Sequence, residues 1–359
     1  MARTLWIDDA GLPVTWDQTR LPFEQVCIPL HDAEACARAI ATMQVRGAPL
    51  IGAVGAWGLA LALREAADDA ALDAALARLA ATRPTAVNLR WALARVREVV
   101  LPLPVAERAA RARVEALRVC DEDVACNAAI GQHGRALLEP LRRADRPLQL
   151  LTHCNAGRLA TIDHGTALAP IYALHEAGAA LHVWVDETRP RNQGASLTAW
   201  ELGERGVPHT VIADNAGGQL MREGRVDAVI VGCDRVAING DVANKIGTYL
   251  KALAAHDNRI PFLVACPVST IDPQAANGEA IPIETRDPAE LTRISGRDDQ
   301  GRVVSVQLTP DGSPGLNPAF DVTPARLVSW LVTEHGPCRP EAAALRRLPG
   351  LAARTEGAA

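Results

Sequence analysis

Two residues suited to chemistry each end an apolar run: Cys154 ends LQLLTHC, and Asp234 ends VDAVIVGCD. If both runs are strands of one parallel sheet, their carboxyl ends open into one crevice, where such sheets bind ligands. A thiol and a carboxyl group in that crevice can move protons to and from a substrate. The alternative is a core thiol and a loop-capping carboxylate, and position alone leaves both open. Strand alternation directs the neighbouring His153 and Cys233 to the other side, so a structural role is expected for both.

A predicted anion site precedes the helix that starts near Pro49. Gly47 and Ala48 leave free backbone N–H groups at this helix start, a geometry that binds anions. Arg46 adds a guanidinium that can donate to a phosphate through two nitrogens. The alternative is a tightly packed core helix beside an incidental arginine.

Further polar residues are expected at the same edge of the sheet. Arg83 precedes another predicted helix, and Gln193 follows the turn after a predicted strand. Asn244 and Lys245 are predicted to open the helix after Asp234, where the lysine can hold a phosphate or an oxyanion. Each of these residues alone is compatible with a solvated surface, but together they indicate a binding site at this edge.

The chain divides into a helical part and an alternating part. Residues 1–145 begin with a predicted hairpin, TLWID and PVTWDQ, and continue with amphipathic helical patterns. Residues 146–338 alternate apolar runs with helical segments, which predicts a Rossmann-like α/β domain whose parallel sheet is covered on both faces. The runs lie at 148–154, 181–187, 209–214, 226–234 and 261–266. The segment 323–336 is predicted as a closing helix, and residues 339–359 as a frayed or loosely docked tail.

The composition excludes several classes of protein. The 359 residues carry 37 basic and 42 acidic side chains, a formal net charge of −5, which argues against a nucleic-acid binder. Eight cysteines without a C-x-x-C pair indicate free thiols in a reducing compartment. The N-terminus lacks a secretory signal pattern, and the longest uncharged run, 48–63, is short for a membrane span. We therefore expect a cytoplasmic protein with no membrane or nucleic-acid partner.

Six motifs carry a resemblance to a known family. RGAPLIG, RPTAVNL, THCNAG, the DETRP…QG…LTAWEL run, the IADN…VDAVIVGCDRV…NGDVANKIGTY run and NPAFDVTP together resemble the methylthioribose-1-phosphate isomerase family. This family is grouped with the alpha, beta and delta regulatory subunits of a eukaryotic translation-initiation guanine-nucleotide exchange factor. The resemblance spans residues 4–337. It implies a helical N-terminal domain, a Rossmann-like C-terminal domain and a homodimer.

The resemblance also implies a reaction, the conversion of 5-methylthio-α-D-ribose 1-phosphate to 5-methylthio-D-ribulose 1-phosphate in methionine salvage. Through THCNAG and GCDRV it implies that Cys154 and Asp234 are the catalytic pair. It implies that the substrate contacts are Arg46, Gly47, Ala48, Arg83, Gln193, Asn244 and Lys245. One departure is Ser196, where the family usually has an arginine after Gln-Gly-Ala, so the substrate loop differs in detail.

The chemistry of this sugar phosphate restricts the mechanism. The anomeric carbon carries the phosphate, so the ring does not open to a free aldehyde unaided. Asp234 as an acid on the ring oxygen, with Cys154 moving hydrogen between C2 and C1, meets this requirement, and both an enediol path and a hydride shift stay open. The sequence has no recognised metal-ligand spacing and no G-x-G-x-x-G after the first strand of the alternating part. Neither a metal nor a dinucleotide cofactor is therefore expected.

Two other functions stay open at this point. One is a regulatory or binding subunit without catalysis. The other is an isomerase of a related phosphorylated pentose, such as 5-deoxyribose 1-phosphate or ribose 1,5-bisphosphate. The presence of both Cys154 and Asp234 in their full motifs favours an enzyme.

Overall fold

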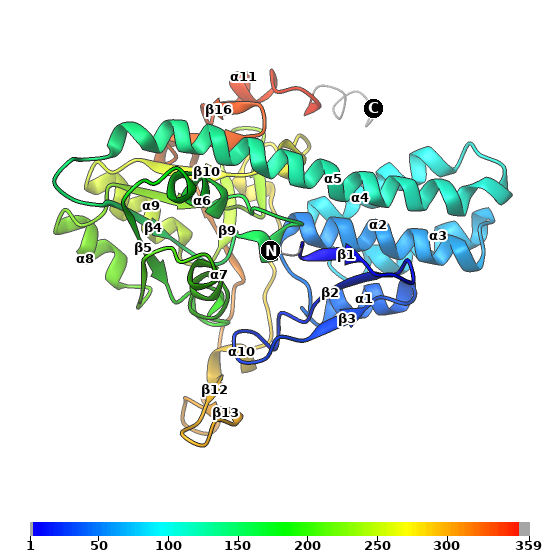
Figure 1. Ribbon diagram of the computed structural model, residues 1–359, viewed down its shortest axis with the longest axis horizontal. Coiled ribbons are helices and arrows are strands. Elements are labelled where there is room, and N and C mark those ends of the chain that lie inside the picture. Colours follow the sequence, from blue (N-terminus) through cyan, green and yellow to red (C-terminus); the bar gives the residue numbers. More distant parts are fainter. Residues whose placement is uncertain (1–2, 352–359) are drawn as a thin grey trace.

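The first part of the chain begins with a small antiparallel sheet (Figure 1). The computed structural model describes residues 3–351, and the strands of this sheet are β1 (Leu5–Ile7), β2 (Pro13–Trp16) and β3 (Cys27–Pro29). β1 and β2 pair as the predicted hairpin, which is therefore confirmed. β3 has no counterpart among the predicted strands, because its three residues are exposed or half-buried and show no apolar alternation.

Five helices follow, as the helical patterns predict. They are α1 (Ala33–Ala41), α2 (Ala48–Glu65), α3 (Asp69–Ala80), α4 (Val87–Val100) and α5 (Val105–Leu138). α2 lies at the centre of this bundle and contacts the other four helices. A Cβ atom at Gly52 would lie 2.9 Å from the carbonyl oxygen of Asn88, so the glycine permits the close approach of α4. α2 also contacts residues 158–160, which places its first turn against the second part of the chain.

The long helix α5 runs along both parts of the molecule (Figure 1) and contacts α2 and α4 in the first part and α6 (Leu168–Glu176) in the second. On α5, the Asp123 carboxylate accepts hydrogen bonds from the backbone N–H of Ile162, at 2.7 Å, and from Asn127 Nδ2, at 2.9 Å. Burial is the main cause that raises the pKa of Asp123 from its ordinary value of 3.8 to about 7. The hydrogen bond between Asp123 and Ile162, which joins α5 to the 158–166 loop, therefore depends on pH.

The raised pKa of Asp123 predicts a pH-dependent stability. The folded protein keeps the Asp123 proton up to about pH 7, whereas the unfolded chain releases it near pH 3.8, so the free energy of unfolding should fall as pH rises between these values. Asp123→Asn keeps an acceptor oxygen and removes the titration, so its stability should change less over that range. Urea unfolding at several pH values measures both slopes, with Asp121→Asn on the exposed side of α5 as the control. Equal slopes for the wild type and Asp123→Asn would contradict the assignment.

The second part is built on a seven-stranded sheet. Its strands are β4 (Leu148–Thr152), β5 (Leu181–Asp186), β6 (His209–Ile212), β7 (Ala228–Val231), β10 (Phe262–Ala265), β15 (Trp330–Thr333) and β16 (Gly336–Cys338). Their order across the sheet is β16-β15-β10-β7-β4-β5-β6, and all neighbours are parallel except β15 and β16. The chain moves from β4 outward to β5 and β6 on one side, and then to β7, β10 and β15 on the other. The predicted Rossmann-like α/β class is confirmed, and such sheets bind ligands where the strand order reverses, here between β4 and β7.

Helices cover both faces of this sheet, which explains the nearly continuous apolar character of its strands. The end of α5, α6 and α7 (Ala199–Glu204) cover one face, and α8 (Ala216–Arg222) and α9 (Thr248–Asp257) cover the other. Leu150 of β4 packs in the first of these two cores, and Leu151 packs in the second. The alternation along each strand therefore supplies both cores.

The predicted closing helix at 323–336 is wrong. This segment contains the end of β14 (Phe320–Thr323), the strand β15 and the start of β16. Leu331 packs in one core and Val332 in the other, as in a central strand. The segment pairs in parallel with β10, and this pairing outweighs its helix-like apolar spacing.

The prediction of a loosely docked tail is wrong for residues 339–351. They include α11 (Ala342–Leu345), and Leu345 and Leu351 are buried in the core beneath α9. The rest of the predicted tail, 352–359, lies outside the described residues. The division of the chain at residue 145 stays a proposal. Within residues 3–351, no helix has the length and apolar character needed to cross a membrane.

A second sheet of four strands follows Asp234 and positions part of the site. Its strands are β8 (Arg235–Ala237), β9 (Val242–Lys245), β11 (Ile271–Asp272) and β14, in the order β11-β8-β9-β14. Asn244 and Lys245 therefore end the strand β9, and the prediction that they open a helix is wrong. α9 begins only at Thr248, after Gly247 with a φ of 103°. Pairing of β9 with both β8 and β14 fixes the direction of these two side chains.

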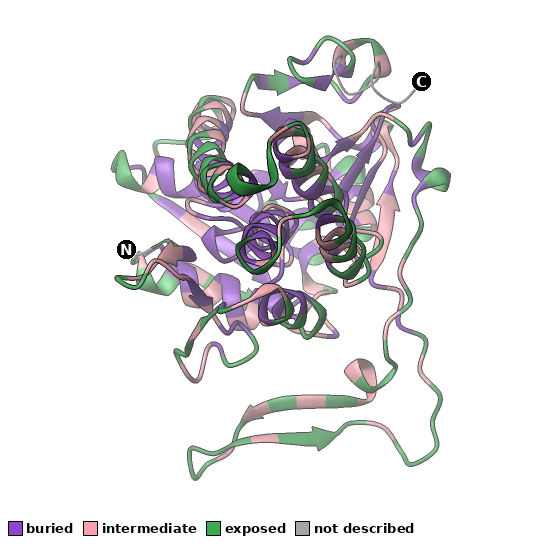
Figure 2. Ribbon diagram, turned by 90° about the vertical axis from the view of Figure 1, so that its right-hand side faces the viewer, coloured by how far each residue is buried: buried purple, intermediate pink, exposed green. Residues whose placement is uncertain are grey.

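A two-stranded hairpin projects from the body of the molecule (Figure 2). It consists of β12 (Arg293–Arg297) and β13 (Val303–Gln307), preceded by the short helix α10 (Ala289–Thr292). Arg297 Nη2 donates to the carbonyl oxygen of Phe23 at 2.9 Å, so the hairpin reaches back to the loop after β2. No helix or strand is predicted from the sequence in this region.

Candidate active site

A pocket opens where the strand order reverses, between β4 and β7. Cys154 lies in the turn after β4, and Asp234 lies in the loop after β7, so the two flank the reversal. The start of α2 and the segment before α4 contribute lining residues from the first part of the chain, and the end of β9 contributes others. All nine predicted site residues line this pocket: Arg46, Gly47, Ala48, Arg83, Cys154, Gln193, Asp234, Asn244 and Lys245.

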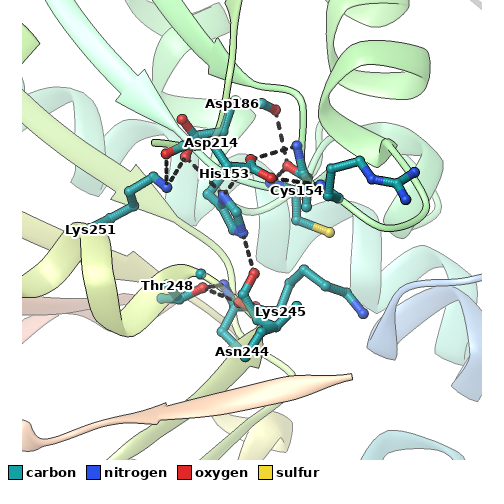
Figure 3. Close-up of polar contacts among 12 residues, drawn as sticks. His153, Cys154, Asp186, Asp214, Asn244, Lys245, Thr248 and Lys251 are labelled. Carbon is teal, nitrogen blue, oxygen red and sulfur yellow. Dashed lines mark hydrogen bonds and ion pairs between the residues drawn. The ribbon is translucent and has the colours of Figure 1, made fainter. Parts of the chain in front are cut away.

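Cys154 has a left-handed backbone conformation, which hydrogen bonds to its N–H group and its carbonyl oxygen stabilise. Its φ is 63°, which is uncommon for a residue other than glycine. Its backbone N–H donates to Thr188 Oγ1 at 2.8 Å, and its carbonyl oxygen accepts from Thr198 Oγ1 at 2.7 Å. Figure 3 shows the side chains of Cys154 and Lys245 extending in the same direction. The loops after β4 and β5 thus fix the direction of the thiol.

Burial and nearby charges set the protonation of the thiol and the carboxyl group. Burial raises the pKa of Cys154, an effect that Arg46 and Lys245 oppose and that Asp234 reinforces. Burial also raises the pKa of Asp234, opposed by Lys245, Arg83 and Arg46. For Lys245, burial lowers the pKa, while Cys154 and Asp234 raise it. The pocket therefore holds two groups that keep their protons to higher pH than usual, beside cations that stabilise either group once it is ionised.

The start of α2 has the geometry of an anion site. Gly47 is the N-cap of α2 with a φ of 91°, and a Cβ atom there would lie 2.5 Å from the Cα of Ala160. Only glycine therefore fits between α2 and the second part of the chain. Arg46 donates from its two terminal nitrogens to the side-chain and backbone oxygens of Asn155, which fixes the guanidinium at the pocket wall. Three of its five N–H groups remain for a ligand.

Two buried polar atoms of the site have no hydrogen-bond partner among the described residues. They are Arg83 Nε and Gln193 Oε1. The terminal nitrogens of Arg83 make two long contacts, 3.4 Å to Glu284 Oε2 and 3.8 Å to Met43 Sδ, and Gln193 is 4 % exposed. Buried polar groups are nearly always paired, so a donor and an acceptor left open in one pocket indicate a polar ligand.

The lining residues that were not predicted from the sequence include Thr85, Arg286 and Phe320. Arg286 is held by Glu284 and Glu290, with shortest contacts of 3.1 and 2.9 Å. The Phe320 ring lies 4.7 Å from Lys245 Nζ, in a cation–π contact. Phe320 lies within the NPAFDVTP motif, which was a usable signal, whereas the irregular segment around Arg286 carries no periodicity from which its position could be predicted.

A cluster beside the pocket holds the buried His153 and Asp186 and the half-buried Asp214, whose ligand-type atoms lie within 4.8 Å of one another. Lys251 Nζ lies 3.2 Å from Asp186 Oδ2 and donates to the Asp214 backbone oxygen. The ammonium of Lys251 therefore already supplies a cation to these carboxylates. The expected structural role of His153 agrees with this arrangement.

The matching proteins agree with this architecture. Residues 44–340 match the model of the initiation factor 2 subunit family. The methylthioribose-1-phosphate isomerase of Rhodospirillum centenum is 58% identical over 97% of this chain and 93% of its own length. The enzyme of the same name from Acidiphilium cryptum is also 58% identical, over 96% of this chain and 94% of its own.

Two solved structures of the same family superpose on nearly the whole chain. The 5-methylthioribose 1-phosphate isomerase of Pyrococcus horikoshii superposes with a TM-score of 0.83 at 39% identity, covering 97% of this chain and 95% of its own. The delta subunit of translation initiation factor eIF-2B from A. fulgidus has a TM-score of 0.79 at 38% identity, covering 97% and 99%. The chain belongs to the initiation factor 2 subunit family and, within it, to the methylthioribose-1-phosphate isomerases.

Proposed function

We propose that the pocket between β4 and β7 isomerises 5-methylthio-α-D-ribose 1-phosphate to 5-methylthio-D-ribulose 1-phosphate, a step of methionine salvage. The observation that carries this proposal is the convergence of Cys154 and Asp234, each with a raised pKa, in a pocket that also holds cations. Aldose–ketose conversion needs a group that donates a proton and a group that supports hydrogen movement between neighbouring carbons. The names of relatives 58% identical over nearly the whole chain support the same reaction.

The proposed chemistry begins with the ring oxygen. Asp234 donates its proton to this oxygen as the C1–O bond breaks, since the phosphate on C1 prevents spontaneous opening. Hydrogen then moves from C2 to C1, with Cys154 at the reacting carbons, and the C2 hydroxyl becomes the ketone. The proton that Asp234 loses is balanced by the one released from the C2 hydroxyl, so the reaction consumes no external oxidant or reductant. Substrate deuterated at C2 distinguishes the two open paths, since a hydride shift retains the label and an enediol exchanges it with solvent.

The proposed phosphate site lies at the start of α2. The backbone N–H groups of Gly47 and Ala48 and the guanidinium of Arg46 donate to the phosphate, and the positive end of the helix dipole favours its charge. Arg83, Asn244 and Lys245 bind the remaining phosphate and sugar oxygens. Gln193 offers its unpaired Oε1 to a sugar hydroxyl.

Arg83→Ala should weaken substrate binding about 10- to 100-fold. A charge-assisted hydrogen bond from an arginine in such a pocket contributes about 1.5–3 kcal/mol, and each 1.4 kcal/mol corresponds to about a factor of ten. Calorimetric titration with an unreactive sugar phosphate measures the loss. Arg64→Ala, at the other end of α2, is the matched control and should bind normally. Normal affinity in both Arg83→Ala and Arg46→Ala would place the phosphate elsewhere.

The apolar part of the lining supports a methylthio group at C5. Met43, Ile281 and Ile283 line the pocket together with Phe320. These side chains do not compensate a second phosphate group, as ribose 1,5-bisphosphate would require. A panel of 5-methylthioribose 1-phosphate, 5-deoxyribose 1-phosphate and ribose 1,5-bisphosphate, assayed for ketose product, tests this preference. The highest kcat/KM is expected for the methylthio sugar, and a preference for the bisphosphate would overturn the choice of substrate.

We also propose a cytoplasmic homodimer. The cytoplasm is supported by eight free cysteines. A second copy would cover apolar side chains that the single chain leaves exposed, among them Val306 and Leu308 on and beside the projecting hairpin. Sedimentation should give about twice the chain mass of 38.1 kDa at micromolar concentration. A monomer at every concentration would contradict the dimer.

A further inference from the structure

We propose that His153 is a positioning residue that carries two ring protons and ties the Cys154 side of the pocket to its Lys245 side. His153 directly precedes Cys154 in the chain, and it bonds to the backbone of Ile246, which directly follows Lys245. The importance of this tie for turnover rests on the proposed function. The protonation and the geometry of the tie are properties of the protein without substrate.

The hydrogen bonds of the His153 ring require a proton on each nitrogen. Nε2 lies 2.8 Å from the carbonyl oxygen of Ile246, which can only accept, so Nε2 must donate. Nδ1 lies 2.8 Å from Asp186 Oδ2, which also accepts from Lys251 Nζ at 3.2 Å. A neutral ring would leave either the carbonyl oxygen or the carboxylate without its donor. The imidazolium form satisfies both contacts, and Figure 3 shows the ring between Asp186 and the segment that carries Asn244 and Lys245.

Charged groups from several elements surround the ring. The side chains of His153 and Asp186 are both 0 % exposed, so water compensates neither. Asp214 Oδ1 lies 3.9 Å from Nδ1, and Asp321 of β14, whose carboxyl oxygens accept from the backbone N–H groups of Gly247 and Tyr249, interacts electrostatically with the ring. Lys251, from α9, is the cation in this group. Asp186 and Asp214 thus place two carboxylates beside the one ammonium of Lys251, and a ring that donates from both nitrogens adds a second cation to this group.

The tie, formed by His153 between the end of β4 and the end of β9, determines the position of Lys245 relative to Cys154. The backbone of Gly247 packs directly on the ring, since a Cβ atom there would lie 2.9 Å from His153 Cε1. The turn between β9 and α9 is thereby held against the end of β4. The thiol and the ammonium influence each other's pKa in the pocket, so their separation matters for the charge on both. Loss of the tie should move Lys245 away from Cys154.

The first test needs no substrate. Nitrogen-15 NMR of protein labelled in its nine histidines should show one ring, absent from the His153→Gln spectrum, with hydrogen on both nitrogens at pH 7.5. One protonated and one bare nitrogen would overturn the proposal. This test needs no substrate and no turnover, only the spectra of the wild type and of His153→Gln.

The second test separates the two bonds of the ring. The amide nitrogen of glutamine can replace Nε2 and keep the bond to Ile246, whereas that of asparagine can replace Nδ1 and loses it. His153→Asn should therefore lower kcat about 10²-fold, the scale expected when a group in the site moves by about 1 Å, and should change KM less. The loss of kcat in His153→Gln should be smaller. Alkylation of Cys154 should also need higher pH in His153→Asn, because the ammonium that lowers its pKa has moved.

The matched control is His133→Gln, because His133 lies outside the pocket and bonds to the carbonyl oxygen of Thr333. It should leave both kcat and the alkylation profile unchanged. Equal losses of kcat in His153→Gln and His153→Asn, with an unchanged pH dependence of Cys154 alkylation, would show that His153 serves only in packing. If the alkylation profile shifts as expected while no sugar phosphate is turned over, the proposed function fails and the tie stands.

Discussion

Asp234→Asn should lower the rate of isomerisation about 10²- to 10⁴-fold, the range expected when a general acid is removed. Asparagine keeps the shape of the side chain but has no proton to give to the ring oxygen. Burial raises the pKa of Asp234, so the wild-type carboxyl group keeps its proton to a higher pH than an exposed aspartate does. Steady-state assays of ketose formation measure the loss, and substrate affinity should change much less than kcat.

The same substitution should not destabilise the protein at neutral pH. Since the folded-state pKa is raised, ionisation of Asp234 lowers the free energy of unfolding as pH rises above its ordinary value of 3.8. Asp234→Asn removes that cost and should be at least as stable as the wild type at pH 7. Asp257→Asn, at the exposed end of α9, is the control for both measurements. Turnover within a few-fold of the wild type would remove Asp234 from the proposed mechanism.

Cys154→Ser should reduce turnover by a similar factor, because an alcohol ionises far less readily than a thiol. The backbone of residue 154 is held by Thr188 and Thr198 through main-chain atoms, so the replacement should not alter the turn. Cys27→Ser, at an exposed position, is the matched control and should retain full activity. Retained activity in Cys154→Ser would show that the thiol only packs.

Protection from alkylation gives an independent measure of where the substrate lies. A small reagent should inactivate the protein in step with modification of Cys154, as mapped by mass spectrometry. A bound sugar phosphate should slow this modification and leave that of Cys27 unchanged, because Cys27 lies on β3, away from the pocket. Equal rates with and without the sugar phosphate would mean that Cys154 is not at the reacting centre.

The parallel sheet could be predicted because its strands are buried on both faces. Leu150 and Leu151 face different cores, so the run LQLLTHC carries apolar residues on both faces of the strand. The same rule that places ligands at strand ends brought Cys154 and Asp234 together, although 79 positions separate them in the chain.

The predictions from sequence are wrong where pairing with distant strands determines the local structure. Lys245 ends a strand because β8 and β14 both pair with β9, and neither pairing is visible in the local sequence. The segment around Leu331 has apolar spacing that suits a helix, but its parallel pairing with β10 makes it a strand. The lining role of Arg286 depends on a long irregular connection, whose course no periodic pattern encodes.

The most direct test of the central claim is product formation by the purified chain. Incubation with 5-methylthio-α-D-ribose 1-phosphate, followed by carbon-13 NMR, should show a ketone carbon at C2 with the wild type. The double variant Cys154→Ser, Asp234→Asn should form none above the uncatalysed rate. The account is contradicted if the wild type forms no ketose, or if the double variant forms it at the wild-type rate.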